Sequence, residues 1–168
     1  MMSDDYSPRW ALPLLQPGQA QKEMFHNEAL VALDLVAQAA VVAAGVNDPP
    51  GAPAEGDCWL IGAAPTGSWT GRAGHLAGWT AGGWRFVVPA EGMAVWVGAE
   101  GLVARRRSGV WAIGEERVAR LMVDGDQVVG GRRPAIATPS GGAVIDAESR
   151  AALEAVLTAL RTHGLIEN

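Results

Sequence analysis

A short phrase occurs twice in this chain, and it limits the folds that the chain can adopt. The residues "AEGDCWLI" at 54–61 are matched by "AEGMAVWV" at 90–97. Each phrase is followed by a Gly-x-Trp pattern, in "GGWRF" and later in "SGVWAI". Each phrase, together with the residues that follow it, therefore predicts a strand, a connection, a second strand, a tight turn and a third strand that contains Gly-x-Trp. The sequence predicts a duplicated β unit whose first copy is enlarged by the insertion "GAAPTGSWTGRAG".

The wider segment between Asp57 and Val129 predicts an antiparallel β meander, because short apolar runs alternate there with turn signals. Asp124 and Gly125 form the strongest hairpin signal, since both residue types tolerate positive φ. A further strand is expected at 41–46, before a proline-rich linker at 47–57. The strands of the meander are expected near 58–61, 75–79, 84–88, 93–97, 102–106, 110–113, 118–123 and 127–129.

A helical pattern precedes this meander and another follows it. Residues 19–40 predict a helix, preceded by a proline-containing arm, with Asn27 as an N-cap within the segment. The second helix is expected to begin after Asp146 as its N-cap and to stop at Gly164. The apolar stripes include Leu30 and Leu33 on the first helix, and Leu153, Val156, Leu157 and Leu160 on the second.

The predicted fold class is therefore α+β: an N-terminal arm and helix, a central antiparallel β meander with a duplicated Trp-containing unit, and a C-terminal helix. The expected segments are 1–46 for the arm and docking helix, 47–130 for the β-rich domain, and 131–168 for a linker and the C-terminal helix. The two apolar stripes are candidate oligomer interfaces, because a stripe without an internal partner is buried against another chain.

The charge of the chain excludes some partners. The net charge is −5, which disfavours nucleic acid, because phosphate binding needs a clustered positive field. Charged residues make up 18% of the chain, below the ~25% usual for soluble domains, so part of the surface is expected to be covered by a partner. No apolar run reaches the ~18 residues of a membrane span, and the polar N-terminus is unlike a signal peptide. The expected site of synthesis is the cytoplasm.

The sequence contains no recognisable catalytic, metal or cofactor motif. The single cysteine, Cys58, lies in an apolar strand, and the three histidines have no metal-ligand spacing. Pairs of acids, such as Glu55 with Asp57, occur only in turns and linkers, so a polysaccharide hydrolase is the weakest of the alternatives. We expect no enzyme activity, no metal and no cofactor.

Tryptophan and arginine provide the best candidate binding residues. Trp69 lies among small residues in the insertion and is expected to be exposed, with Trp79 as a second indole for stacking on a sugar ring. The dense basic run at 105–107 either faces water at a hairpin end or meets an acidic partner. The candidate glycan-binding residues are Trp69, Trp79, Arg105, Arg106 and Arg107. The competing interpretation is that the tryptophans fill the core or subunit contacts.

Several motifs resemble those of an uncharacterised family of phage-derived proteins. They are "GQAQK" at 18–22, "NEAL" at 27–30 followed by Leu33 and Asp34, "EGD" at 55–57, "TGSW" at 66–69, "GWRF" at 83–86 and "PAEG" at 89–92. The C-terminal segment, "RRPAIATPSGGAVIDAESRAALEAVLTALRTHGLI", resembles the last helix of phage tail-fibre and spike-type proteins.

Such genes occur in prophages and in gene-transfer agents, so the resemblance implies a virion protein, a head spike or tail fibre that helps to attach the particle to the host cell surface. The partners that it implies are further copies of the chain as a trimer or pentamer, other virion proteins, and cell-surface polysaccharide as a ligand. It implies neither nucleic-acid binding nor membrane insertion. The alternative function is a monomeric carbohydrate-binding module.

Overall fold

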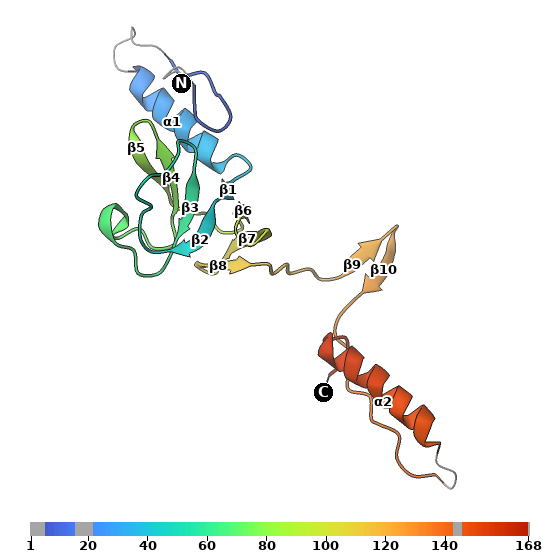
Figure 1. The fold of residues 1–168 in the computed structure, drawn as a ribbon. Helices are drawn as coiled ribbons and strands as arrows, with labels where there is room; N and C mark the ends of the chain where they lie inside the picture. Colours follow the sequence, from blue (N-terminus) through green and yellow to red (C-terminus); the bar gives the residue numbers. More distant parts are fainter. Residues whose placement is uncertain (1–5, 16–21, 143–145, 168) are drawn as a thin grey trace. The chain divides into compact units, whose positions relative to one another are not determined.

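The computed structural model describes residues 6–15, 22–142 and 146–167, and it divides into two compact units, Met1–Glu115 and Glu116–Asn168 (Figure 1). The N-terminal unit contains helix α1 (Lys22–Val36) and two four-stranded sheets. The first sheet has the order β2-β3-β4-β5, and the second has the order β1-β6-β7-β8. The strands are β1 (Ala40–Val41), β2 (Ala43–Val46), β3 (Cys58–Ile61), β4 (Leu76–Thr80), β5 (Gly83–Val87), β6 (Ala94–Val97), β7 (Leu102–Arg107) and β8 (Val110–Ile113).

The two sheets confirm the predicted duplication at the level of single hydrogen bonds. Gly56 N–H donates to the Trp79 carbonyl over 2.9 Å, and Gly92 N–H donates to the Arg106 carbonyl over 2.8 Å. Trp79 and Arg106 therefore occupy equivalent positions of the two repeats. Trp79 is paired in register with Trp84, as Arg106 is paired with Trp111.

One short segment, residues 40–46, completes both sheets. Its first part, β1, pairs in parallel with β6, and its second part, β2, pairs in parallel with β3. Each antiparallel three-stranded meander therefore gains one parallel strand from the same stretch of chain. The strand expected at 41–46 is thus confirmed as two strands that serve different sheets.

The two repeats stack with equivalent faces pointing the same way. The main core joins Leu60 and Leu76 of the first sheet to Val95, Val97 and Ala104 of the second. A second cluster on the other face of the first sheet contains Trp59, Ile61, Trp69 and Ala77. The hydrogen-bond register makes Trp59 equivalent to Val95 and Ala77 equivalent to Ala104. The face that holds the tryptophans in the first repeat is therefore the face that packs on its neighbour in the second.

Helix α1 packs on the first repeat because a glycine admits it. Leu35 is fully buried in the main core, and a Cβ atom at Gly78 would overlap its two δ-methyl groups. In the second repeat, the residue equivalent to Gly78 is Arg105. Arg105 pairs with Ala94 as Gly78 pairs with Cys58 in the first repeat. An ion pair between Glu28 and Arg85 of β5, with a distance of 2.8 Å between Oε1 and a terminal guanidinium nitrogen, also links helix and sheet.

The N-terminal arm is fastened to the end of α1 by a buried carboxylate. Asp34 is fully buried and accepts hydrogen bonds from Ser7 Oγ at 2.6 Å, Arg9 N at 3.0 Å and Trp10 N at 2.7 Å. The Arg9 guanidinium in turn donates to backbone carbonyls at the C-terminal end of the helix, those of Asp34, Leu35, Ala37 and Gln38. These donors satisfy carbonyls that a helix end leaves without partners.

Asn27 is not an N-cap, because it lies inside α1. Its side-chain amide instead donates to the Leu15 carbonyl and accepts from the Leu15 N–H, over 3.0 and 2.9 Å. The side chain therefore acts as a short strand partner for the arm. A helix was expected at 19–40, and the structure confirms it over Lys22–Val36. Its expected end was wrong, because residues 37–39 lie outside the helix and Ala40 already belongs to β1. The first expected residues, 19–21, lie outside the described part of the chain.

The C-terminal unit consists of a two-stranded hairpin, β9 (Leu121–Val123) and β10 (Asp126–Val129), and helix α2 (Ala147–Thr162). The N-cap of α2 is Asp146, as predicted, and its carboxylate accepts from Ser149 N at 2.9 Å, which lowers the pKa of Asp146. Gly164, at φ +71°, follows the end of the helix as expected. The chain after it returns so that Ile166 is buried beside Arg133, with which it forms a β-bridge.

The α+β fold class is thus confirmed, with two helices flanking the meander. The two units differ from the three expected segments in two respects. The arm and α1 form one unit with β1–β8, and the hairpin β9–β10 belongs with the C-terminal helix rather than with the other strands.

Candidate functional site

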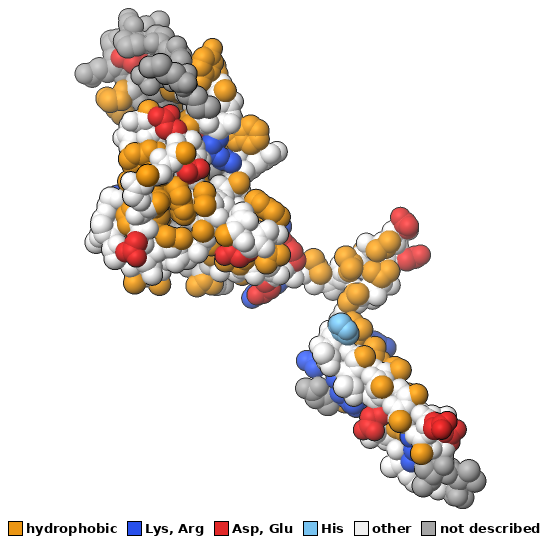
Figure 2. All heavy atoms as spheres, viewed as in Figure 1, with side chains coloured by type: hydrophobic (Ala, Val, Ile, Leu, Met, Phe, Trp, Pro, Cys, Tyr) orange, Lys and Arg blue, Asp and Glu red, His pale blue; other side chains and the backbone are white. Residues whose placement is uncertain are grey.

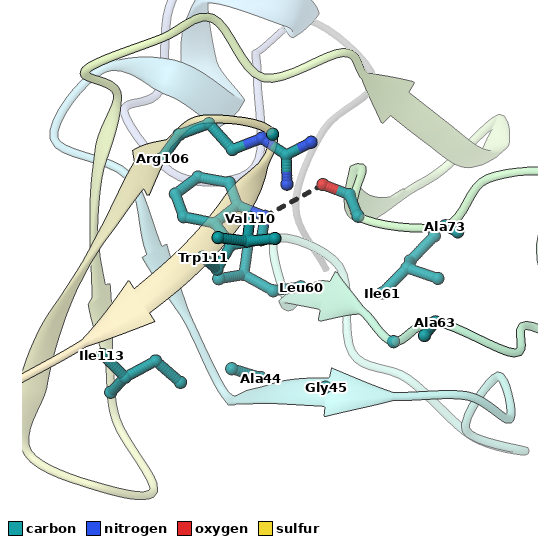
Figure 3. Close-up of a pocket in the computed structure, with 13 residues that line it drawn as sticks. Ala44, Gly45, Leu60, Ile61, Ala63, Ala73, Arg106, Val110, Trp111 and Ile113 are labelled. Atoms are coloured by element: carbon teal, nitrogen blue, oxygen red, sulfur yellow. Dashed lines mark hydrogen bonds between the residues drawn. The ribbon is translucent and has the colours of Figure 1, made fainter.

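The strongest candidate site is a cleft of about 330 Å³ between the two repeats, which we call the inter-repeat cleft. Figure 3 shows its two walls: Arg106, Val110 and Trp111 on one side, and Ile61, Ala63 and Ala73 on the other. The lining is mainly apolar. The complete lining is Ala44, Gly45, Leu60, Ile61, Gly62, Ala63, Ala73, Gly74, Arg106, Gly109, Val110, Trp111 and Ile113.

The cleft is hollow because the first repeat presents small residues to it. Strand β2 contributes Ala44 and Gly45, while the long β3–β4 connection contributes Gly62, Ala73 and Gly74. Glycine has no side chain and alanine has only a methyl group, so these residues leave space beside the larger side chains of β8. The β3–β4 connection therefore forms one wall of the cleft without filling it.

Trp111 and Arg106 supply the polar groups of the second wall. The indole N–H of Trp111 donates to the Gly74 carbonyl over 2.9 Å, which fixes the ring against the first repeat (Figure 3). The Arg106 guanidinium lies 5.7 Å from the centroid of the Trp111 ring, within cation–π range. Among the residues that the structure describes, Arg106 makes no ion pair with a carboxylate. The result is a half-buried positive charge at an apolar cleft.

The equivalent surface of the first repeat is closed. Trp84, the counterpart of Trp111, is contacted edge-to-face by Trp79 at 5.0 Å and by Trp69 at 5.1 Å between ring centroids. Trp69 comes from the short helix η1 (Gly67–Trp69) of the insertion. In the second repeat, Arg106 replaces Trp79, and the β6–β7 connection at 98–101 is too short to carry a counterpart of Trp69.

The expectation that Trp69 is exposed was wrong. Its side chain has no solvent-accessible surface, and it packs with Trp59 and Trp84. Its indole N–H has no hydrogen-bond partner among the described residues. The insertion was taken for an exposed loop because its residues are small, but those small residues allow the chain to fold over the sheet. Trp69 is therefore a core residue and has no free face for a sugar.

The other candidate binding residues do not form one site. Trp79 is half-buried against Trp84. Arg105, Arg106 and Arg107 are half-buried on β7, and strand alternation places Arg106 on the face opposite to its two neighbours. Only Arg106 lines the inter-repeat cleft. Trp111 is a cleft residue that was not predicted from the sequence, although an alignment of the two repeats by their glycines places it opposite Arg106.

The candidate interface residues are divided between the units. Leu30 of α1 is half-buried, and Leu33 is 53% exposed. On α2, Leu153 and Val156 are exposed, Leu160 is half-buried and Leu157 is buried. The stripe on α2 thus has one member that is already covered within its own unit.

Other chemically reactive groups give no competing site. Burial raises the pKa of the Cys58 thiol to about 11, so at neutral pH the thiol is protonated and a poor nucleophile. The described residues contain no cluster of three or more histidine, cysteine or acidic side chains that could hold a metal ion. None of the described helices has the length and apolar character that crossing a membrane requires.

A comparison with protein families matches residues 26–112, more than half of the chain, to DUF2793, a family of proteins of unknown function. The chain belongs to the DUF2793 family. The matched residues run from α1 to β8 and so include both repeats and the inter-repeat cleft, while the C-terminal unit lies outside the match. No curated protein and no solved structure matches the chain.

Several residues that carry the sequence resemblance have structural partners within the N-terminal unit. Asp34 holds the arm, Asn27 pairs with Leu15, and Glu28 pairs with Arg85. The carboxylate of Glu91 accepts from the Ser108 N–H in the β7–β8 turn over 3.0 Å. These motif residues therefore hold the arm, α1 and the turns of the two sheets in place.

Proposed function

We propose that this chain is a homo-oligomeric structural component of a phage-like particle, a head spike or tail fibre that takes part in attachment to the host cell surface. The resemblance of its motifs to phage-derived proteins supports a place in a virion. In this proposal the chain acts by binding and not by catalysis. Its partners are further copies of itself and other virion proteins, with cell-surface polysaccharide as the ligand of the assembled particle.

The observation that carries the proposal is the incomplete core of the C-terminal unit. Among its described residues only Leu157 and Ile166 are buried hydrophobic side chains. Every residue of β9 and β10 is exposed, on both faces of the hairpin. The exposed apolar side chains of the hairpin are Leu121, Met122, Val123, Val128 and Val129, each at least 41% accessible, and Figure 2 shows apolar side chains at the surface of this unit.

Such a unit needs a partner in order to be stable. A two-stranded hairpin is at best marginally stable in water, and it becomes stable when further strands or a helix cover an apolar face. One partner can cover one face, so a hairpin with apolar side chains on both faces is suited to an assembly of several copies. A trimer or a pentamer of the chain supplies these contacts through closed cyclic symmetry.

The mass of the full chain in solution tests the oligomer. Light scattering after gel filtration is expected to give three or five copies, and Val123→Asp together with Val128→Asp is expected to give monomers. Val88→Asp is the matched control, because Val88 is 72% exposed in the N-terminal unit and its substitution should leave the oligomer intact. All seven tryptophans precede residue 116, so unchanged tryptophan fluorescence shows that the N-terminal unit is still folded.

A parent chain that stays monomeric at every concentration would refute self-assembly. The location is tested separately by mass spectrometry of purified particles, and absence of the chain from them would refute the virion assignment. A carbohydrate-binding module that relies on Trp69 requires an exposed Trp69 side chain, but this residue is buried. Glycan binding is therefore examined on the assembled protein.

A further inference from the structure

We propose that the inter-repeat cleft binds an aromatic side chain from an extended segment of a partner polypeptide, with an acidic side chain on the same face of that segment paired to Arg106. The proposal concerns the N-terminal unit alone and stands whether or not the C-terminal unit assembles as proposed above. It assigns a protein-binding site to the region that the family match covers.

The first step of the argument is a precedent within the molecule. In the first repeat, Trp84 is contacted in a T-shaped pair by an indole from another segment, that of Trp69, with 5.1 Å between ring centroids. In the second repeat, the equivalent Trp111 borders an open cleft. The repeats share a hydrogen-bond register, so Trp111 occupies the position that has an aromatic neighbour in the first repeat. A ring beside Trp111 would have to come from another chain segment, because the 98–101 connection is too short to provide it.

The second step is the match of size and polarity. A cleft of about 330 Å³ lies at the small end of the range for ligand sites, ~300–1,000 Å³. Its mainly apolar walls offer few partners for the hydroxyl groups of a sugar ring, whereas an aromatic ring needs none. Aromatic rings gain additional energy from edge-to-face contact, and the tryptophans of the first repeat already use that geometry.

The third step is charge complementarity. Arg106 is half-buried over Trp111 and has no carboxylate partner among the described residues. Its five N–H donors fit a carboxylate in bidentate geometry. An acidic group on the occupant would therefore remove the cost of an uncompensated, partly desolvated charge.

The fourth step is the free strand edge beside the cleft. Strand β8 is the last strand of its sheet and pairs only with β7 among the described strands. Val110 and Ile113 of β8 line the cleft and are 62% and 39% exposed. An extended segment can add to such an edge through its backbone, as in β-strand addition. Alternate side chains of a strand share a face, so the acid lies two positions from the ring.

The proposal is tested with the full-length chain and a synthetic probe, acetyl-Glu-Thr-Trp-Val-amide. Binding is followed by the NMR signal of the Trp111 indole N–H, assigned by its loss in Trp111→Phe. We expect this signal to shift on titration of the probe, and a probe with alanine in place of tryptophan to leave it unmoved. Ala73→Leu, which narrows the cleft from the opposite wall, should weaken binding of the parent probe.

Arg106→Gln isolates the ion pair, and Arg105→Gln is the matched control with the same change in charge on the other face of β7. Arg106→Gln should weaken binding of the glutamate probe about tenfold or more, as expected for a charge-assisted hydrogen bond. It should hardly affect a probe with glutamine in place of glutamate. Arg105→Gln should change neither affinity by much.

Three results would overturn the proposal. The Trp111 signal could stay in place at all probe concentrations, which would show that the cleft takes no aromatic side chain. Arg105→Gln and Arg106→Gln could weaken binding equally, which would reduce the effect to net charge. Free indole-3-acetate could bind as tightly as the peptide, which would assign the cleft to a small aromatic acid instead of a polypeptide.

Discussion

The buried carboxylate of Asp34 offers the sharpest test of how the N-terminal unit holds together. Its two oxygens accept three hydrogen bonds, from Ser7 Oγ, Arg9 N and Trp10 N, at 2.6–3.0 Å. Replacing it by alanine leaves these three donors without an acceptor, and Ser7 itself is only 2% exposed. Removing one side of a buried charged network costs roughly 3–5 kcal/mol. We therefore expect Asp34→Ala to lower the free energy of unfolding of the N-terminal unit by about that amount.

Urea unfolding followed by tryptophan fluorescence measures this loss directly. All seven tryptophans lie in the N-terminal unit, so the signal reports its unfolding and not that of the C-terminal unit. Asp34→Asn should have an intermediate effect, because the amide keeps one acceptor oxygen but turns its NH₂ group toward a donor. Asp57→Ala is a matched control, because the Asp57 carboxylate accepts a turn hydrogen bond from Ala54 N at 3.0 Å at an exposed site.

A decrease in the free energy of unfolding below about 1 kcal/mol for Asp34→Ala, the size expected for an ordinary substitution, would contradict this role of the carboxylate. Such a result would mean that the arm contributes nothing to the stability of the folded unit. An equal decrease in the free energy of unfolding for Asp57→Ala would show that the burial of Asp34 does not determine the size of the effect.

Three further outcomes are expected. Trp69→Ala should lower the free energy of unfolding by about 3–5 kcal/mol in the same urea assay. Trp69→Phe should lower it much less, because this substitution also removes a buried N–H that lacks a partner among the described residues. Equal decreases for the two variants would contradict the assigned core role. Gly78→Ala should destabilise by about 1–3 kcal/mol because its methyl group meets the buried Leu35, while Gly51→Ala, in open space, should be neutral; thermal unfolding compares the two. The Cys58 thiol should react with iodoacetamide only on unfolding. Burial raises the pKa of the folded thiol to about 11 from its ordinary value of 9.0, so stability should fall as pH rises from about 9 toward 11, and this loss should be absent in Cys58→Ala.

The strand pattern and both helices could be predicted because they depend on local signals. Turn glycines and alternating apolar residues placed the strands to within a few residues, and Asp146 marked the start of α2 correctly. The interpretation of Asn27 as an N-cap was wrong, because an asparagine that caps a helix and one that pairs with a neighbouring backbone segment cannot be told apart by residue type. The distinction depends on where Leu15 lies, which no local pattern contains.

The candidate site was only partly predictable for the same reason. Arg106 was named as one of three adjacent arginines, but only the strand register separates it from Arg105 and Arg107. Trp69 was expected to be exposed, because small neighbours usually mark a surface loop. In this chain the insertion folds back over Trp84, and that choice depends on contacts between residues far apart in the sequence.

The sequence by itself determined the duplicated β unit, the two flanking helices and a cysteine placed in an apolar strand, since each follows from local periodicity, turn chemistry and composition. Only the tertiary structure decided that 40–46 serves both sheets, that equivalent faces point the same way, and that small residues leave a cleft beside Trp111. The physical reason is that strand pairing and face-to-face packing join residues distant in the chain. Their free energy depends on shape and register, and neither can be read from a local stretch of residues.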